Sequence, residues 1–345
     1  MKEFIKKVVI FSSLIIIFCF LLAEIKFTDD FISSQTYGTD YEKVGWNLNV
    51  INNRKEDVKN GVIFLGSSYV LNGVNDSILS LNGIKSLNLA IKHPSNDLAL
   101  YFLKRLAPLK PKEIIFLKGK TFFGDLHKLS PLLYRPSELL NDGQSINLFF
   151  ISYLFKRAKL SIEYLFYVLK NKKGKKDYDN KYGIRYEESY MSNHQFYAKE
   201  EIKKRQLEEE SFNLNQNNFL YQSEKNNTNW LKRIKSLKRK LIFNYYSQND
   251  LLNNTTSQEN FVFTAKEKCK ENDIIFSQIY LPVVSDAVSN LPKNEIPFML
   301  LKSDADVIYF FKDYNFLNDN TLWTDKHHLS KNGSIFFTSK LKDKL

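Results

Sequence analysis

Cysteine is scarce in this sequence. The 345 residues include two, Cys19 inside an apolar N-terminal run and Cys269 in the C-terminal part. Two cysteines so placed exclude a disulfide framework and the paired spacing of a zinc site. Cys19 also lacks the preceding small residues of a lipoprotein signal, and the sequence shows no internal repeat. The length is sufficient for one large domain or two modest ones.

Acidic residues are in the minority. The chain has 50 lysines and arginines against 38 aspartates and glutamates, a net charge of +12 and a pI near 9.3. Net charge bears on solubility and association rather than on fold. The excess therefore indicates either a lysine-rich surface without a specific role or attraction to an anionic envelope surface or polymer. We do not expect nucleic acid as a partner, because the N-terminus indicates export.

An apolar run at residues 8–23 follows three lysines and precedes several acidic residues. It is shorter than the about 20 residues that span a bilayer as a helix, but Ile5 and the lysine stems extend it. Lysines before the run and acids after it predict a cytoplasmic N-terminus with the remainder of the chain outside. A small-x-small cleavage site is missing. We therefore predict a membrane anchor over residues 1–26, with a cleaved signal peptide or a buried helix as alternatives.

Strand and helix signals alternate after the anchor. Short apolar runs predict five strands, at residues 62–65, 84–91, 113–117, 274–280 and 307–311. Helical spacing is found at residues 96–106, 261–272 and 329–341. This alternation predicts an α/β fold, a three-layer α/β/α sandwich with a five-stranded parallel sheet.

The alternation is interrupted, which divides the soluble part into three segments. Residues 27–125 form the first part of the α/β domain, 126–260 a helical insertion, and 261–345 the second part. The insertion contains an aromatic helical stretch at 146–169, a KKGKK linker at 172–176 and charged helical runs within 195–240. The aromatic stretch either packs against the sheet or lies on the membrane surface.

Two short segments offer catalytic chemistry. Gly66-Ser67-Ser68 follows the first predicted strand, and Asp325 and His328 follow the last, within TDKHHLSKNG. The carboxyl ends of parallel strands meet at one edge of a sheet, so these segments should come together. A serine hydroxyl becomes nucleophilic when a base takes its proton, and the base needs an orienting partner.

The spacing assigns a role to each residue. Side chains at i and i+3 share one face of a helical turn, so Asp325 can orient His328 towards Ser68. His327 is the competing histidine, and it should point away. The alternative interpretation is structural: Gly-Ser-Ser is an ordinary turn and DKHHLS a solvated loop in which Asp325 caps the final helix.

With these residues the chain resembles the SGNH (GDSL-type) hydrolase superfamily. More narrowly, it resembles the membrane-anchored, extracytoplasmic SGNH-like proteins of bacterial envelope polysaccharide acylation, including those of alginate acetylation and teichoic-acid D-alanylation. The resemblance places Ser68 at the nucleophile position, with Gly73 as the glycine that often follows, and matches the Asp-x-x-His block to Asp325 and His328. It implies a five-stranded α/β/α sandwich that lies outside the cytoplasm and is anchored in the bacterial cytoplasmic membrane.

The two middle blocks of the family depart from its pattern. The second block normally has a glycine whose N–H serves the oxyanion hole, whereas NLAIKHPSND has Asn88, with His93 and Pro94 nearby. The third normally has an asparagine, and residues 118–121 contain none. The oxyanion-hole candidates are therefore the backbone N–H groups of Ser68 and Tyr69, with Asn88 as a weaker one.

These observations predict a serine esterase or O-acyltransferase that acts on an envelope glycan through Ser68, His328 and Asp325. The chemistry requires neither a metal nor a nucleotide. A second hypothesis is a non-catalytic scaffold or glycan-binding protein on the same fold, partnering a membrane acyltransferase. A third is a structural envelope protein that works through the basic insertion.

Overall fold

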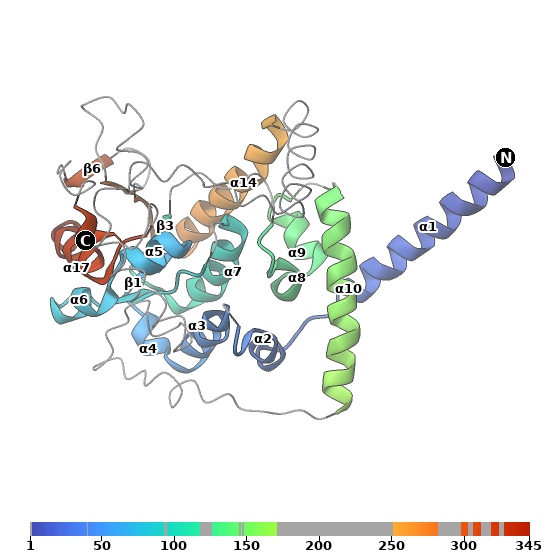
Figure 1. Ribbon diagram of the computed structural model, residues 1–345, viewed down its shortest axis with the longest axis horizontal. Helices are drawn as coiled ribbons and strands as arrows, with labels where there is room; N and C mark the ends of the chain where they lie inside the picture. The colour runs from blue at the N-terminus through green and yellow to red at the C-terminus, as the bar shows by residue number, and fades with distance from the viewer. Residues whose placement is uncertain are drawn as a thin grey trace.

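The computed structural model is a mixed α/β protein with one long helix at its N-terminus (Figure 1). The residues that the structure describes are 2–39, 41–92, 95–117, 126–144, 146, 148–170, 251–281, 298–302, 306–311, 319–323 and 328–345. The predicted linker at 172–176 and the predicted charged helices within 195–240 lie outside these residues.

Six strands form one sheet in the order β2-β1-β3-β4-β5-β6. Their bounds are β1 Val62–Leu65, β2 Ser86–Asn88, β3 Glu113–Leu117, β4 Ile275–Tyr280, β5 Phe298–Lys302 and β6 Asp306–Phe311. The strands β1 to β4 pair in parallel, and β5 is antiparallel to both β4 and β6. Because β6 follows two reversals, it runs in the same direction as β1 to β4.

The predicted strands are all present, but the sheet is not wholly parallel as predicted. The additional strand β5 pairs with β6, and residues 303–305 connect the two. A parallel neighbour requires a long crossover, whereas an antiparallel one requires a short turn. The sequence contains the corresponding signal, since Ser-Asp-Ala-Asp separates the apolar runs FMLLK and VIYFF.

Strand β1 is buried on both faces. Ile63 and Leu65 belong to one hydrophobic cluster, and Val62 and Phe64 belong to the other. This division follows from the two-residue period of a strand. A strand buried on both sides has a continuous apolar sequence, which is why VIFL predicts one.

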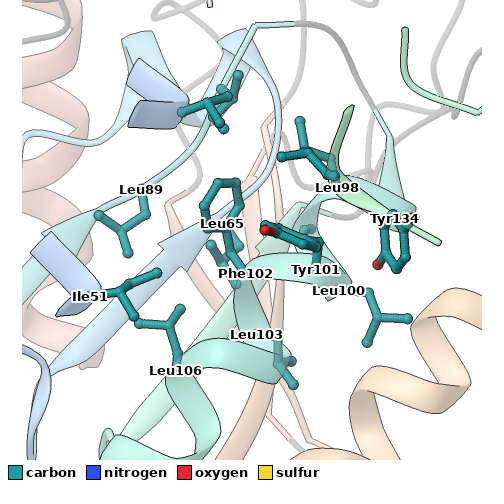
Figure 2. Packing of buried hydrophobic residues seen from close by; sticks show 14 of the residues in the cluster. Ile51, Leu65, Leu89, Leu98, Leu100, Tyr101, Phe102, Leu103, Leu106 and Tyr134 are labelled. Carbon is teal, nitrogen blue, oxygen red and sulfur yellow. The ribbon is translucent and has the colours of Figure 1, made fainter. Parts of the chain in front are cut away.

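The larger cluster joins the sheet to α3 (Glu42–Asn53), α7 (Asn96–Leu106) and α14 (Leu251–Lys270). Figure 2 shows Phe102 of α7 packed beside Leu65 of β1. The helix predicted at 96–106 is confirmed with the same bounds, and α14 begins ten residues before its predicted start at residue 261.

The smaller cluster lies on the opposite face of the sheet. It contains apolar residues of α5 (Ser68–Gly73), α6 (Asp76–Leu81) and α17 (Lys331–Leu341), among them Val70 and Phe337. Helix α17 lies beside α5 and α6. The C-terminal part of the chain therefore packs against the segment that carries the predicted nucleophile.

Six further α-helices and three 3-10 helices complete the described part of the chain. They are α1 Lys2–Ala23, α2 Asp29–Thr36, α4 Lys55–Val58, α8 Ser130–Leu133, α9 Pro136–Asn141 and α10 Leu148–Leu169, with 3-10 helices at Ala107–Leu109, Asn320–Leu322 and Lys342–Lys344. Helix α1 projects from the rest of the molecule (Figure 1). Its length and mean hydropathy of 2.4 suit a membrane span, and its most apolar window is 0% buried.

Candidate active site

Ser68 is the first residue of α5, directly after the turn that follows β1. The turn needs glycine at position 66, because a Cβ there would lie 2.8 Å from the Cβ of Leu117 on β3. Ser67 is fully buried, and its Oγ accepts a hydrogen bond from the Tyr69 N–H at 3.3 Å as the N-cap of α5. Ser67 therefore begins the helix, and Ser68 is left half-buried at its entrance.

The Ser68 hydroxyl meets an imidazole from the far end of the sequence. His328 Nε2 lies 2.9 Å from Ser68 Oγ, although the two residues are 260 positions apart. The His328 ring also stacks on the Tyr69 ring, with centroids 5.5 Å apart and planes 20° from parallel. The structure therefore brings together the two side chains to which the sequence analysis assigns the roles of nucleophile and base.

The described residues on either side of His328 in the sequence contact one another. Trp323 and Leu329 form an antiparallel bridge that flanks His328. The Ser330 N–H donates to the Leu322 carbonyl at 2.9 Å, and Ser330 Oγ donates to the Thr321 carbonyl at 2.7 Å. These contacts tie the residues after His328 to the 3-10 helix before it.

Helix α17 approaches this 3-10 helix very closely. A Cβ on Gly333 would lie 1.9 Å from the Leu322 carbonyl oxygen, so glycine is required there. The N-cap of α17 is Ser330, whose Oγ accepts from the Gly333 N–H at 3.1 Å. The alternative in which Asp325 caps the final helix is therefore wrong.

Helix α17 is also bonded to the end of α5. The Asn75 N–H donates to Thr338 Oγ1 at 2.8 Å, and Ser334 Oγ donates to the Gly73 carbonyl at 3.4 Å. Each of these bonds joins residues more than 260 positions apart. The helix that carries Ser68 and the helix that follows His328 thus form one unit.

The third predicted member of the site, Asp325, lies outside the described residues, as does His327. The same holds for His93, Pro94 and residues 118–121, where the departures from the family pattern fall. Of the three predicted catalytic residues, the structure therefore describes Ser68 and His328.

Asn88 is present beside α5, but its polar groups are already engaged. Its amide nitrogen donates to the carbonyls of Val70 at 2.9 Å and Val74 at 2.8 Å, and its own N–H donates to Asp76 Oδ2 at 2.8 Å. The residue is 1% exposed. The Asn88 side chain therefore binds backbone carbonyls in α5 and at its C-cap. These bonds do not support its predicted role as an oxyanion donor.

Two buried ionisable residues near Asn88, Lys43 and Asp76, are absent from the sequence prediction. Lys43 Nζ donates to the Asn88 carbonyl at 2.6 Å, and both Lys43 and Asp76 are buried. Burial raises the pKa of the Asp76 carboxyl and lowers the pKa of the Lys43 ammonium. The two residues are 33 positions apart with no shared motif, so the sequence contains no signal for this cluster.

The geometry suits general-base activation of a serine. The imidazole can accept the Ser68 proton directly, and the Ser68 N–H belongs to the first turn of a helix, whose N–H groups have no intrahelical acceptor. The Tyr69 N–H is shared with Ser67 Oγ, so a substrate oxygen would compete for it. Among the described residues, no group of three or more His, Cys, Asp or Glu gathers that could hold a metal.

Comparisons with known proteins do not add to this geometry. No family model, no curated protein and no solved structure matches the chain. The arrangement defines a serine-histidine site on a mixed α/β sheet, and its function is inferred from that arrangement.

Proposed function

We propose that this protein is a membrane-anchored, extracytoplasmic SGNH-like serine esterase or O-acyltransferase whose substrate is a bacterial envelope glycan. The observation that carries the proposal is the 2.9 Å contact between His328 Nε2 and Ser68 Oγ. The helices on both faces of a mainly parallel sheet agree with the α/β/α architecture of that superfamily.

The mechanism follows from the two described groups. His328 takes the proton as Ser68 Oγ attacks an acyl ester carbonyl, forming a tetrahedral intermediate. His328 then returns the proton to the departing alcohol, which leaves an acyl-serine. A water molecule completes hydrolysis, or a glycan hydroxyl completes transfer, with His328 again as the base. Asp325 is proposed to orient His328, and the Ser68 N–H to bind the oxyanion, with the Tyr69 N–H as a second donor.

The proposed topology places α1 across the bacterial cytoplasmic membrane, N-terminus inside. Its basic N-terminal end, with Lys2, Lys6 and Lys7, supports this orientation. The net charge of +12 supports an anionic glycan or envelope surface as the partner.

Full-length protein in detergent tests the proposal. We would measure labelling by a fluorophosphonate probe and hydrolysis of a small acetyl ester in wild type, Ser68→Ala and His328→Ala. Both variants should lose turnover by about 10⁴-fold or more, because serine and base act as a unit. Ser67→Ala is the matched control, since this neighbouring serine caps α5 and should leave labelling in place.

A scaffold that partners a membrane acyltransferase is the second candidate function. It is favoured by the engagement of Asn88 in bonds to α5, which removes one predicted oxyanion donor. A missing oxyanion donor typically reduces kcat by about 10²–10³-fold. Folded wild-type protein that neither labels nor turns over an acetyl ester, but binds an envelope glycan, would support this function instead.

A further inference from the structure

Helix α10 carries an apolar stripe on its exposed side. Phe155, Ile162, Phe166 and Leu169 are 47%, 45%, 58% and 78% exposed. Their spacing of seven, four and three residues places them on one face of the helix over four turns. Single exposed apolar residues are ordinary on a protein surface, whereas an aligned row of large ones marks a contact surface.

The stripe faces away from the protein. The opposite side of α10 contributes Phe150, Tyr153 and Leu154 to the larger hydrophobic cluster. Arg157 and Ser161 on that side are also buried. Since one face of α10 already packs against the core, the stripe has a separate reason to be apolar.

The buried side of α10 contacts the C-terminal end of α1. Arg157 Nε donates to the Ala23 carbonyl at 3.1 Å, and its Nη2 donates to the Ile25 carbonyl at 2.6 Å. The Arg157 guanidinium also lies 3.6 Å from the centre of the Phe27 ring. A side chain of α10 thus binds the last carbonyl of α1 and the carbonyl two residues beyond it.

The residues that directly follow α1 pack against the rest of the protein. Ala23 is fully buried, and Glu24 accepts hydrogen bonds at 2.8 Å from the N–H and the hydroxyl of Ser137 at the start of α9. Helix α10 lies across the base of α1, at the side of the molecule from which α1 projects (Figure 1). A bilayer spanned by α1 would therefore begin beside α10.

Cationic side chains border the stripe. Lys156 and Lys170 are exposed beside it, and Lys159 lies within the row, in the seven-residue gap after Phe155, with its Nζ 3.8 Å from Glu163 Oε1. An exposed apolar row with lysines beside it is the pattern of a helix that lies in a membrane interface. The lysines would meet the anionic headgroups at the same depth.

We propose that the stripe of α10 (Phe155, Ile162, Phe166 and Leu169) is a lipid-contacting surface, seated on the outer leaflet of the bilayer that α1 spans. The proposal rests on α1 being the membrane anchor of the proposed function. It adds a second contact, which fixes the orientation of the domain on the membrane. Interfacial helices of this kind bury their apolar face by about 5–10 Å.

Site-directed spin labelling of the full-length chain tests the surface. In a Cys19→Ser, Cys269→Ala background, single nitroxides would be attached after Phe166→Cys and Ile162→Cys and the protein placed in phosphatidylethanolamine–phosphatidylglycerol vesicles. Collision rates with oxygen, which enters lipid, are compared with those of a water-soluble nickel chelate. Leu81→Cys is the matched control, an 85% exposed leucine on α6, which Figure 1 places far from α1. Phe11→Cys reports on α1 itself.

The expected result is an oxygen-to-nickel ratio several-fold higher at positions 162 and 166 than at 81. A water-like ratio at 162 and 166 with a lipid-like ratio at 11 would overturn the surface and leave the anchor intact. A water-like ratio at 11 would overturn both. Low collision rates with both reagents at 166, together with spin–spin broadening between chains, would assign the stripe to a second copy and reject the lipid contact.

Discussion

Two adjacent serines in the turn after β1 have different tasks. Ser67 Oγ caps α5 by accepting from the Tyr69 N–H, and Ser68 Oγ meets His328. Ser67→Ala removes the cap, which typically reduces the free energy of unfolding by about 1 kcal/mol. Urea denaturation measures this loss, and probe labelling of Ser68 should persist in the same sample. Loss of labelling in a stable Ser67→Ala protein would contradict the assignment.

The buried carboxyl of Asp97 makes stability depend on pH. Burial raises the pKa of Asp97 to about 6 from its ordinary 3.8, although the Ser130 hydroxyl and the His127 N–H both donate to it. Between these pH values the folded state holds more protons at this group than the unfolded state. Its contribution to the free energy of unfolding therefore falls as the pH rises from about 4 to 6.

Asp97→Asn should remove that contribution. We expect urea denaturation at pH 4, 5 and 6 to show a flatter dependence of unfolding free energy on pH for the variant than for wild type. The amide can still accept one hydrogen bond and donate another, so the site need not collapse. An unchanged slope would show that Asp97 is not the responsible group.

The sequence predicts the contact between Ser68 and His328 better than the surroundings of that contact. Ser68 and His328 were identified because both follow strands whose carboxyl ends share one edge. The contacts of Asn88 were not predicted. The orientation of an amide depends on which carbonyls tertiary packing places beside it, and here these are the carbonyls of Val70 and Val74. The Lys43 contact to Asn88 was missed for the same reason.

At the scale of elements, α17 supports the segment that ends in His328, the proposed base. Gly333→Ala would place a Cβ against the Leu322 carbonyl, a backbone atom that cannot rotate away. We expect a loss of about 1–3 kcal/mol in the free energy of unfolding, as for overpacked sites, and slower labelling of Ser68 because the segment of His328 must shift.

Asn332→Ala is the matched control for that substitution. Its side chain is exposed one position earlier on the same helix, so its effect should stay within about 0.5 kcal/mol. Denaturation and probe-labelling rates on both variants provide the comparison. Equal stability of the two variants would mean that α17 and the 3-10 helix separate easily.

Among the elements, continuous apolar runs were the reliable signal. The strand VIFL was predicted because burial on two faces requires a continuous apolar run. The helix at 96–106 was predicted because burial of one helical face requires apolar residues at helical spacing. Strand β5 was not predicted, and its antiparallel direction depends on its connections rather than on its own residues. The start of α14 at residue 251 was missed because its first ten residues are mostly polar.

For the whole molecule, the junction after α1 belongs to the folded domain. Phe27 and Phe31 are 4% and 1% exposed, and the carbonyls of Ala23 and Ile25 bind Arg157. A chain shortened to begin at residue 21 keeps these contacts, whereas one that begins at residue 33 loses them. We expect the second to be less stable by at least about 3 kcal/mol, the scale of one lost buried phenylalanine.

Denaturation of both shortened chains measures the difference. Similar unfolding free energies would mean that the junction contributes little.

The same contacts affect the hypothesis of a structural protein that works through its basic insertion. Deletion of residues 140–260 would be a direct test of that hypothesis, but it would also remove α10 with Arg157. Loss of function after that deletion would therefore report loss of the fold.

The position of His328 also determines when the proposed site can assemble during synthesis of the chain. A ribosome completes Ser68 260 residues before His328, an interval of roughly 13–50 s at about 5–20 residues per second. Throughout that interval the nascent chain carries a serine without its base. On the proposed topology, α17 must also cross the bilayer before it can dock on α5. On this proposal Ser68 would gain its base only after translocation. Esters inside the cell would then not encounter an assembled site.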